Sequence, residues 1–417
     1  MGLIALLAAF GAATAQAASA PSSSAVAGKL DGIWYWALPT TPNGLVSTQS
    51  WSGAAATPEG VYVAGMDHKT NSALFRLDAD VLRYVGDARS ASEAAHNWMA
   101  GEVAEKFHTR PVWHDGRVYV ANLNSSTLDD TYLGLRGFHW YAHGATTGRF
   151  VDLSAGRPGG TAAAHGGLIA QVVDPARDCI YGALAPTGDI YRYDIVSGAS
   201  ERLGRPDYRR PYVYPGRAMW VARSGRLYFT AGSAELAYYG APYDPAIFNH
   251  VYFYDPHARK FGEMKSWKLH DERAIDASQC FRRISGIDEC FLSDNVGHIY
   301  KFSESAAGEK WSYLGDIGQD TSQPFGYAWV FHVFDRQNAI YIVTTEGRFF
   351  EFDLVTRKAS ELANLKSLEP MLADKMFFYG HDAKAGSRFY FTAFGRTGSA
   401  LLVAIDPKLL KAALAAR

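Results

Sequence analysis

The sequence predicts an all-β fold, a seven-bladed β-propeller, because one short hydrophobic phrase returns seven times. Each copy is rich in β-branched and aromatic residues, as in Gly60-Val61-Tyr62-Val63, which is typical of a strand. The copies begin at Gly60, Arg117, Cys179, Arg226, Glu289, Ala339 and Arg388, 47 to 63 residues apart. A second hydrophobic run, usually ending in Asp, follows each copy. A period near 50 with several short strands per unit indicates a propeller.

The innermost strand of each blade is expected directly before the repeated phrase. The first lies near Trp51, and the others cover Arg110–Trp113, Leu168–Val173, Ala218–Ala222, Phe281–Ile284, Trp329–Phe334 and Met376–Tyr379. Longer insertions between the second and third strands are expected in blade two, from Asn122 to Gly137, and in blade four, from Ala231 to Asn249. Such loops gather on one face, where repeat folds often bind ligands.

A hydrophobic segment from Gly32 to Leu38 stands alone before the first blade. The last blade has no outer strand after Asp406, because the chain ends there in a helical pattern. We therefore expect the N-terminal segment to complete blade seven, which would close the ring and cover two open edges. The Ser/Ala-rich stretch from Ala18 to Lys29 predicts a flexible leader.

The first 20 residues predict a secretory signal peptide. The apolar run from Leu3 to Phe10 is too short to span a membrane, and Ala15-Gln16-Ala17 fits a cleavage site. We expect a secreted or periplasmic protein without a membrane anchor, with residues 21–417 as one propeller domain. The formal net charge of −1 gives no argument for nucleic-acid binding.

Three cysteines, Cys179, Cys280 and Cys290, are too few for a disulfide framework. Three interpretations stay open for them. They are buried thiols, or Cys280 and Cys290 form a disulfide, or a metal site uses them. In the last case Cys280, Cys290, His332 and His381 would meet in the central channel as a tetrahedral site.

Candidate catalytic residues are those that break the repeat. His143 ends the second run of blade two, where most blades have Asp, and His165 enters the innermost strand of blade three. Arg217 enters the innermost strand of blade four at a comparable position. We expect these three side chains to converge on one central cleft. Imidazoles there can move protons, and a guanidinium can pair with a carboxylate.

Tyr208, one of 24 tyrosines, lies on the segment that leads to Arg217. We expect Arg217 and His165 to hold a carboxylate and His143 and Tyr208 to move protons, with the roles of base and acid left open between these two. Weaker candidates for substrate binding are His108 beside the inner strand of blade two, Tyr214 just before Arg217, and Tyr243 in the blade-four insertion.

The sequence has no Gly-x-Ser-x-Gly elbow, no standard phosphate loop and no carboxylate pair at matching ring positions. The remaining constellation of His, Arg and Tyr suits β-elimination on a uronate. That reaction needs a neutralised carboxylate, a base for the neighbouring C–H and an acid for the departing oxygen.

With His143, His165, Tyr208 and Arg217, the chain resembles the propeller-fold polysaccharide lyases, and most closely the ulvan lyases. The resemblance covers the whole mature chain as architecture and implies a His pair, a Tyr and an Arg at the site. Tyr208 lies nearer Arg217 than the family pattern places its Tyr, so Tyr212 and Tyr214 stay open. The resemblance also implies structural zinc, with Cys280, Cys290 and His381 as a loose match, and sometimes calcium.

We therefore expect a monomeric, secreted lyase that cleaves an anionic, ulvan-like polysaccharide and uses no organic cofactor. Two alternatives remain open at this point: a lyase for another uronate polymer such as oligogalacturonate, and a propeller that binds carbohydrate or protein without catalysis.

Overall fold

The computed structural model describes residues 20–124, 130–231, 250–265, 277–284, 287–294, 297–305, 308–318, 330–378 and 380–417. The expected signal peptide, apart from Ala20, lies outside these ranges. The blade-four insertion after Ala231, which includes Tyr243, also lies outside them. For His381 only the backbone is described. No helix in the described ranges is long and apolar enough to cross a membrane.

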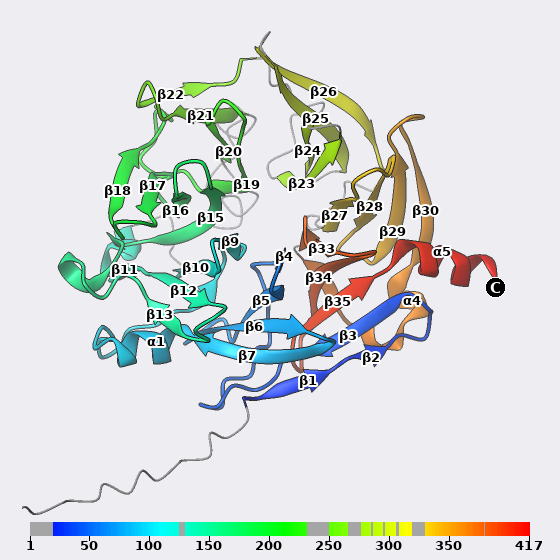
Figure 1. Cartoon of the computed structure of the whole chain (residues 1–417), viewed down its shortest axis with the longest axis horizontal. Coiled ribbons are helices and arrows are strands. Elements are labelled where there is room, and N and C mark those ends of the chain that lie inside the picture. Colours follow the sequence, from blue (N-terminus) through cyan, green and yellow to red (C-terminus); the bar gives the residue numbers. More distant parts are fainter. Residues whose placement is uncertain are drawn as a thin grey trace, which may run out of the picture.

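The predicted seven-bladed β-propeller is confirmed, with seven mainly antiparallel sheets arranged around a central axis (Figure 1). Blade one contains β4 (Ala54–Thr57), β5 (Gly60–Met66), β6 (Ser72–Asp78) and β7 (Val81–Asp87), with β1 (Ser22–Ser24) outside them. Blade two contains β8 (Lys106–Phe107), β9 (Val112–His114), β10 (Arg117–Leu123), β12 (Trp140–Gly144) and β13 (Phe150–Asp152).

Blade three contains β15 (Gly167–Asp174), β16 (Cys179–Ala185), β17 (Ile190–Asp194) and β18 (Ser200–Gly204). Blade four contains β19 (Pro215–Val221), β20 (Leu227–Ala231), β21 (Val251–Asp255) and β22 (Lys260–Glu263). Blade five contains β23 (Ala277–Ile284), β24 (Ile287–Asp294), β25 (His298–Ser305) and β26 (Gly308–Asp316).

Blade six contains β27 (Val330–Val333), β28 (Ala339–Val343), β29 (Arg348–Asp353) and β30 (Lys358–Asn364), and β32 (Gly380–His381) runs parallel to β27. Blade seven contains β31 (Met376–Phe378), β33 (Lys384–Ala385), β34 (Arg388–Phe394), β35 (Leu401–Ile405), β3 (Ile33–Ala37) and β2 (Val26–Ala27).

A few elements lie outside the blades. β11 (Gly137–Phe138) pairs with β14 (Ala163–Ala164). The α-helices within the described residues are α1 (Ala88–Ala94), α4 (Leu365–Leu368) and α5 (Pro407–Ala415), and the 3-10 turns there are η1 (Asp130–Gly134), η2 (Pro158–Gly160) and η3 (Pro370–Leu372).

The predicted closure of the ring is also confirmed, because β3 pairs with β35 from Ile33–Ile405 to Ala37–Leu401. The expectation of a flexible leader up to Lys29 is wrong. Within that stretch β1 pairs with β7 of blade one and β2 pairs with β3 of blade seven. One short segment therefore joins the first and last blades, and we call residues 22–37 the clasp.

The hydrophobic core lies between neighbouring blades. One cluster joins Tyr181 and Ile190 of blade three to Phe229 of blade four, and another joins Phe291 of blade five to Phe331 of blade six. These side chains are less than 3 % exposed. Each pair of adjacent sheets thus packs face to face, which fixes the inner strands around the axis.

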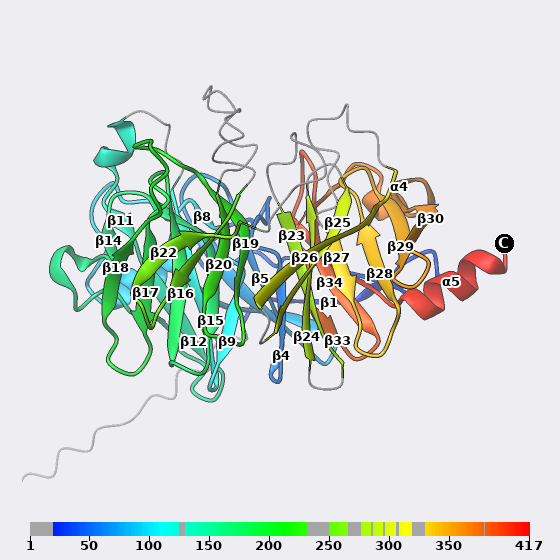
Figure 2. The ribbon, with the colours of Figure 1, turned by 90° about the horizontal axis from the view of Figure 1, so that it is seen from above.

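The two faces of the ring carry different connections between strands. The inner strands start at the face that also carries the β10–β12 connection, which we call the upper face. Hairpins between first and second strands, such as His114–Arg117, form the lower face. In Figure 2, which shows the ring from its side, β8 lies toward the upper face and β9 toward the lower one.

Candidate functional site

The inner strands of blades one to four are interrupted by bulges where they approach the axis. In blade two, Phe107 pairs with Asn122 and Val112 pairs with Tyr119. The four residues 108–111 of the inner strand therefore lie opposite only two residues of β10, 120 and 121. Blade one has a bulge of the same size: Gln49 pairs with Met66 and Ala54 pairs with Val63, so residues 50–53 lie opposite residues 64 and 65. Bulges of this kind redirect side chains and are frequent beside functional sites.

Side-chain hydroxyls replace part of the ladder that these bulges remove. Thr109 Oγ1 donates to Ala121 O at 3.3 Å and accepts from Ala121 N at 3.0 Å. Ser50 Oγ donates to Ala64 O at 2.6 Å in blade one. The bulges are therefore held by hydrogen bonds, and the residues beside Thr109, namely His108 and Arg110, are directed away from the regular sheet.

Blade four has a bulge at Arg217, one of the candidate residues predicted from the sequence. Pro215 pairs with Ala231 and Met219 with Phe229, so three residues including Arg217 face Thr230 alone. Gly216 makes this possible, because a Cβ at that position would overlap Thr230 Oγ1. The Arg217 side chain is half-buried.

His108 and Arg217 are the two candidates that the structure brings together. His108 is 3 % exposed, and its Nδ1 lies 3.2 Å from Ile169 O of blade three. Burial, followed by the cations Arg217 and Lys106, holds the pKa of His108 well below its ordinary value. The imidazole is therefore neutral at physiological pH, and the charged groups that act most strongly on it are both cations.

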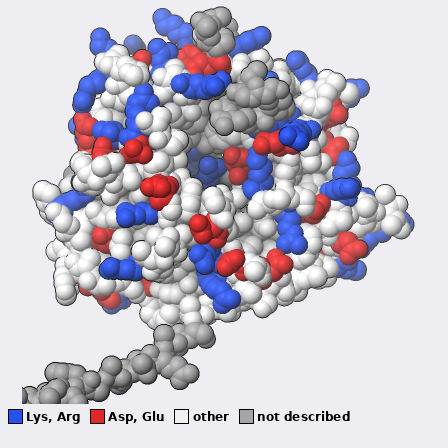
Figure 3. Space-filling view, viewed as in Figure 1, with Lys and Arg blue, Asp and Glu red and all other residues white. Residues whose placement is uncertain are grey.

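A second charged pair lies deeper in the hub, which we define as the inner ends of the seven blades. Arg110 of blade two and Asp382 of blade seven are both half-buried, and each acts electrostatically on the other. Burial raises the pKa of Asp382, although Lys384 and Arg110 oppose the change. Lys384 Nζ lies 3.2 Å from Asp382 Oδ1 and donates to Val333 O at 2.7 Å. In Figure 3 basic side chains lie in the hollow at the centre of the ring.

The upper rim of the hub adds two further groups near His108. Lys106 is 6 % exposed, and its Nζ lies 3.4 Å from His68 Nε2. His68 also lies 3.4 Å from Glu105. Its ring is 6.3 Å from that of Trp51, which occupies the bulge of blade one. The upper hub of blades one, two and four therefore combines cations, imidazoles and an indole with the Glu105 carboxylate.

His165 lies at the upper face and is half-buried. Its Nδ1 is 2.9 Å from Leu135 O of the β10–β12 connection. Tyr132 from the same connection contacts His165 edge-on at 6.2 Å and Tyr212 edge-on at 5.7 Å between ring centroids. These three rings form an aromatic rim over blades two to four.

His143 does not lie in this site, and the reason is a shift of one residue. In blades three and six the Asp that ends the third strand pairs with the first residue of the second strand, as in Cys179–Asp194. In blade two the partner of Arg117 is Gly144, and His143 pairs with Val118. His143 therefore occupies the inward position that Tyr193 holds in blade three, which is a core position.

The surroundings of His143 agree with a structural role. It is 4 % exposed, and its Nδ1 lies 3.1 Å from Tyr62 Oη of blade one. Burial, and then the charge of Arg76, lowers the pKa of His143 to about 4. The imidazole is a neutral part of the contact between blades one and two.

His143 and His165 lie on opposite faces of the ring. His143 is level with Val118 near the lower end of β10, whereas Gly167, two residues after His165, abuts Leu123 at the upper end. These levels are about 17 Å apart at about 3.3 Å per residue. The expectation that the two imidazoles share one cleft is therefore wrong.

Two of the candidate tyrosines, Tyr208 and Tyr214, belong to the core between blades three and four. Tyr208 is 4 % exposed and contacts Tyr252 edge-on at 5.2 Å, and burial raises its pKa well above the ordinary value. Tyr214 is 2 % exposed. Tyr212 remains the half-buried tyrosine of this segment.

The proposed disulfide and the shared metal site of Cys280 and Cys290 are wrong. Cys280 pairs across the ladder with Phe291, the neighbour of Cys290. Cross-strand partners share a face and successive residues alternate, so the two thiols point to opposite faces of blade five. They lie in different core clusters, and all three cysteines are free thiols.

The other expected metal ligands are His332 and His381. His332 is fully buried and stacks on Phe389, with ring centroids 4.7 Å apart. The His381 side chain lies outside the described part of the structure. Among the residues that are described, no group of three or more His, Cys, Asp or Glu could hold a metal ion.

A separate buried ion network anchors the connection before blade two. His139 lies 2.9 Å from Asp152 Oδ2 and 3.0 Å from Glu102 Oε1, and Arg136 pairs with Glu102 at 2.6 Å. Burial alone would lower the pKa of His139, but the two carboxylates raise it above its ordinary value. Asn97 completes the network with a bond to Asp152 at 2.8 Å.

The sequence-based selection missed Arg110, Lys106 and Asp382 at the hub. A usable signal for Arg110 was Pro111, since proline cannot donate within an inner strand and marks a bulge. The same signal precedes Arg217 as Pro215-Gly216. Asp382 carries no such local signal, because the turn that places it follows the pairing of β32 with blade six.

Comparison with known proteins identifies the architecture. No family model matches the chain, and no curated protein matches it. Solved structures do: YCF48 from Cyanidioschyzon merolae has a TM-score of 0.50 and 9 % identity over 90 % of this chain and 99 % of that one. The RRP9 WD40 repeats have a TM-score of 0.52 and 8 % identity over 92 % and 99 % of the two chains. At such identities the likeness is one of fold, and the chain is a seven-bladed β-propeller.

Proposed function

We propose that the upper hub binds an anionic polysaccharide through a uronate carboxylate beside Arg217 and His108. The supporting observation is the charge around His108, where the dominant neighbours Arg217 and Lys106 are both cations. A carboxylate bound there would offset their repulsion and accept charge-assisted hydrogen bonds from the planar guanidinium.

The aromatic rim supports a sugar ligand rather than a bare anion. Tyr132, His165 and Tyr212 lie on the same face as the bulge that carries Arg217. Aromatic rings with a polar edge offer an apolar surface and a hydrogen-bonding tip, which suits a sugar ring. A chain bound across this rim would extend from the hub toward blades two and three.

Elimination at the uronate is the reaction that this arrangement favours. The base removes the proton from the carbon beside the carboxylate, a carbon–carbon double bond forms, and the bond to the departing oxygen breaks as that oxygen takes up a proton. Arg217 would neutralise the carboxylate, and neutral His108 would be the base in place of His143. Tyr212, which the family resemblance leaves open, would be the acid.

The test combines binding with product detection on one set of polysaccharides: ulvan, pectate, alginate and glycosaminoglycans. Calorimetry reports binding, and ultraviolet absorbance reports the unsaturated uronate. Binding together with absorbance supports the lyase. Binding without absorbance supports the non-catalytic carbohydrate-binding propeller, and no binding to any member contradicts the proposal.

A matched pair of variants assigns the site. Arg217→Gln removes the guanidinium at the hub, whereas Arg209→Gln removes an exposed one from the preceding segment. A charged hydrogen bond contributes about 1.5–3 kcal/mol, so Arg217→Gln should weaken binding by about 10- to 100-fold. Arg209→Gln should leave it unchanged. Equal affinities for both variants would remove Arg217 from the site.

A further inference from the structure

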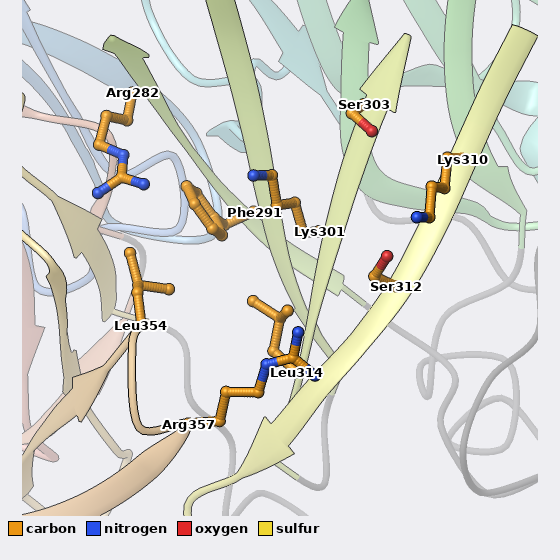
Figure 4. A pocket seen from close by; sticks show the side chains of 9 residues that line it. All are labelled: Arg282, Phe291, Lys301, Ser303, Lys310, Ser312, Leu314, Leu354 and Arg357. Carbon is orange, nitrogen blue, oxygen red and sulfur yellow. The ribbon is translucent and has the colours of Figure 1, made fainter. Parts of the chain in front are cut away.

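A pocket of about 260 Å³ lies between blades five and six, away from the hub (Figure 4). Strands β25 and β26 provide one wall, and the hairpin between β29 and β30 provides the other. The described residues that line it include no carboxylate and four cationic side chains, which are Arg282, Lys301, Lys310 and Arg357. None of these four is among the candidate residues predicted from the sequence.

The ladder explains why these side chains share one face. Lys301 pairs with Ser312 and Ser303 pairs with Lys310 across β25 and β26. Cross-strand partners point to the same side, and residues two apart do so as well. Two ammonium groups and two hydroxyls therefore form one polar surface, which Figure 4 shows facing the pocket.

The inner end of the pocket is fixed. Arg282 is 7 % exposed and binds Glu289 Oε2 through Nε at 2.8 Å and Nη2 at 2.6 Å. Lys301 pairs with the same carboxylate. Arg282 and Lys301 lie on either side of the Phe291 ring, 5.3 Å and 5.9 Å from its centroid (Figure 4). Two cations thus share one negative charge.

The outer end of the pocket is not neutralised. Lys310 and Arg357 are exposed, and within the described part of the chain neither forms an ion pair or a side-chain hydrogen bond. Arg357 extends from the blade-six hairpin over Leu314 of β26 (Figure 4). The pocket therefore presents an excess of positive charge with hydroxyl donors beside it.

We propose that this pocket binds a tetrahedral oxyanion monoester carried on a single sugar residue. Lys310, Arg357 and the two serine hydroxyls would hold the oxyanion, and Leu314 and Leu354 would contact the sugar. The volume is just below the range of about 300–1,000 Å³ found for drug-sized ligands, which suits one monosaccharide. The proposal is independent of the function proposed for the hub.

The test measures binding of glucose 6-sulfate, glucose 6-phosphate, inorganic sulfate, inorganic phosphate and glucose to the full chain by calorimetry. We expect the two monoesters to bind and glucose not to bind. A preference for the sulfate ester points to a sulfated glycan, and a preference for the phosphate ester points to a phosphorylated sugar. Inorganic ions that bind as tightly as the esters would contradict the sugar contact.

The double variant Lys310→Gln/Arg357→Gln should weaken monoester binding at least tenfold, because it removes the two charges that no partner offsets. Both side chains are exposed, so the fold should be retained, which thermal unfolding checks. Lys408→Gln on α5 removes an equally exposed lysine and is the matched control. Unchanged affinity in the double variant, or no monoester binding at millimolar concentration, would overturn the proposal.

Discussion

At the scale of single residues, charge and burial separate the histidines of this chain into different roles. His108 is neutral and surrounded by cations, His139 lies between two carboxylates, and His143 is neutral within the core. The three pKa values are displaced for different reasons, so each histidine predicts a different response to pH or to substitution.

Arg217→Gln should raise the pKa of His108 toward its ordinary value, because the variant removes the stronger of two repelling cations. The pKa should still stay below the ordinary value, since burial is the larger cause. An NMR titration of the His108 ring in the free protein measures this without any ligand. The Arg209→Gln control should show the wild-type pKa. An unshifted pKa in Arg217→Gln would show that Arg217 does not act on His108.

His143 should make the fold less stable in acid. Its pKa is about 4 in the folded state and about 6.5 when unfolded, so the unfolded chain binds the proton first. Stability from this residue is complete above pH 6.5 and is lost as pH falls toward 4, on the order of 3 kcal/mol in total. Urea unfolding at pH 7 and pH 4.5 measures the difference.

The variant His143→Phe tests the assignment, since phenylalanine does not titrate and blades three and six have aromatic residues at the equivalent position. The loss of stability between pH 7 and pH 4.5 should shrink by about 2.5 kcal/mol. His96→Gln, which removes an exposed histidine, should keep the wild-type loss. If both variants lose as much stability as the wild type between pH 7 and pH 4.5, His143 is not the group that causes this loss.

His139→Gln should destabilise the fold by about 3–5 kcal/mol, because it leaves Asp152 and Glu102 buried without their shared cation. The raised pKa of His139 means that its contribution is present at and below its ordinary pKa and is lost as pH rises through the raised value. Denaturant unfolding at about pH 6, below the ordinary pKa of histidine, checks the cost. A change below 1 kcal/mol would show that the network is not charged as described.

At the scale of elements, the clasp is the feature that joins the ends of the ring. Trp36 of β3 donates from Nε1 to Asp80 O in the β6–β7 turn at 2.9 Å. Arg388 of blade seven pairs with Asp80 at 3.0 Å and lies 3.7 Å above the Trp34 ring. Blade seven is therefore tied to blade one by side chains as well as by β1.

Removal of residues 1–38 should open two strand edges, on β7 and β35, and cause self-association. A chain that starts at Ser22 keeps the clasp and should remain monomeric. Size-exclusion chromatography with light scattering compares the two. A synthetic peptide of residues 20–38 should restore the monomer of the shorter chain, and a monomeric shorter chain without peptide would contradict the role of the clasp.

Much of this architecture could be predicted from the sequence, because strand patterns and turn residues are local. The seven phrases and the lone segment around Trp34 led directly to the blades and the closure. The site was harder to predict, because a slip of one residue moved His143 from a turn to the core. Bulges at Thr109 and Gly216 depend on contacts between strands, and Asp382 depends on a pairing between two blades.

At the scale of the whole molecule, core clusters between neighbouring blades and the clasp make the ring a single closed unit. We expect one cooperative unfolding transition, with coincident curves from far-UV circular dichroism and tryptophan fluorescence. Repeat arrays with free ends lose this cooperativity. Separate transitions for the two probes in the intact chain would indicate that the blades unfold in groups.

The measurement that tests the central claim most directly is calorimetric titration of a uronate oligosaccharide into the wild-type chain, Arg217→Gln and Arg209→Gln. The hub model predicts saturable binding to the wild type and to Arg209→Gln, and affinity lower by about 10- to 100-fold for Arg217→Gln. Equal binding to all three chains, or none to the wild type, would contradict a carboxylate site at Arg217 and His108.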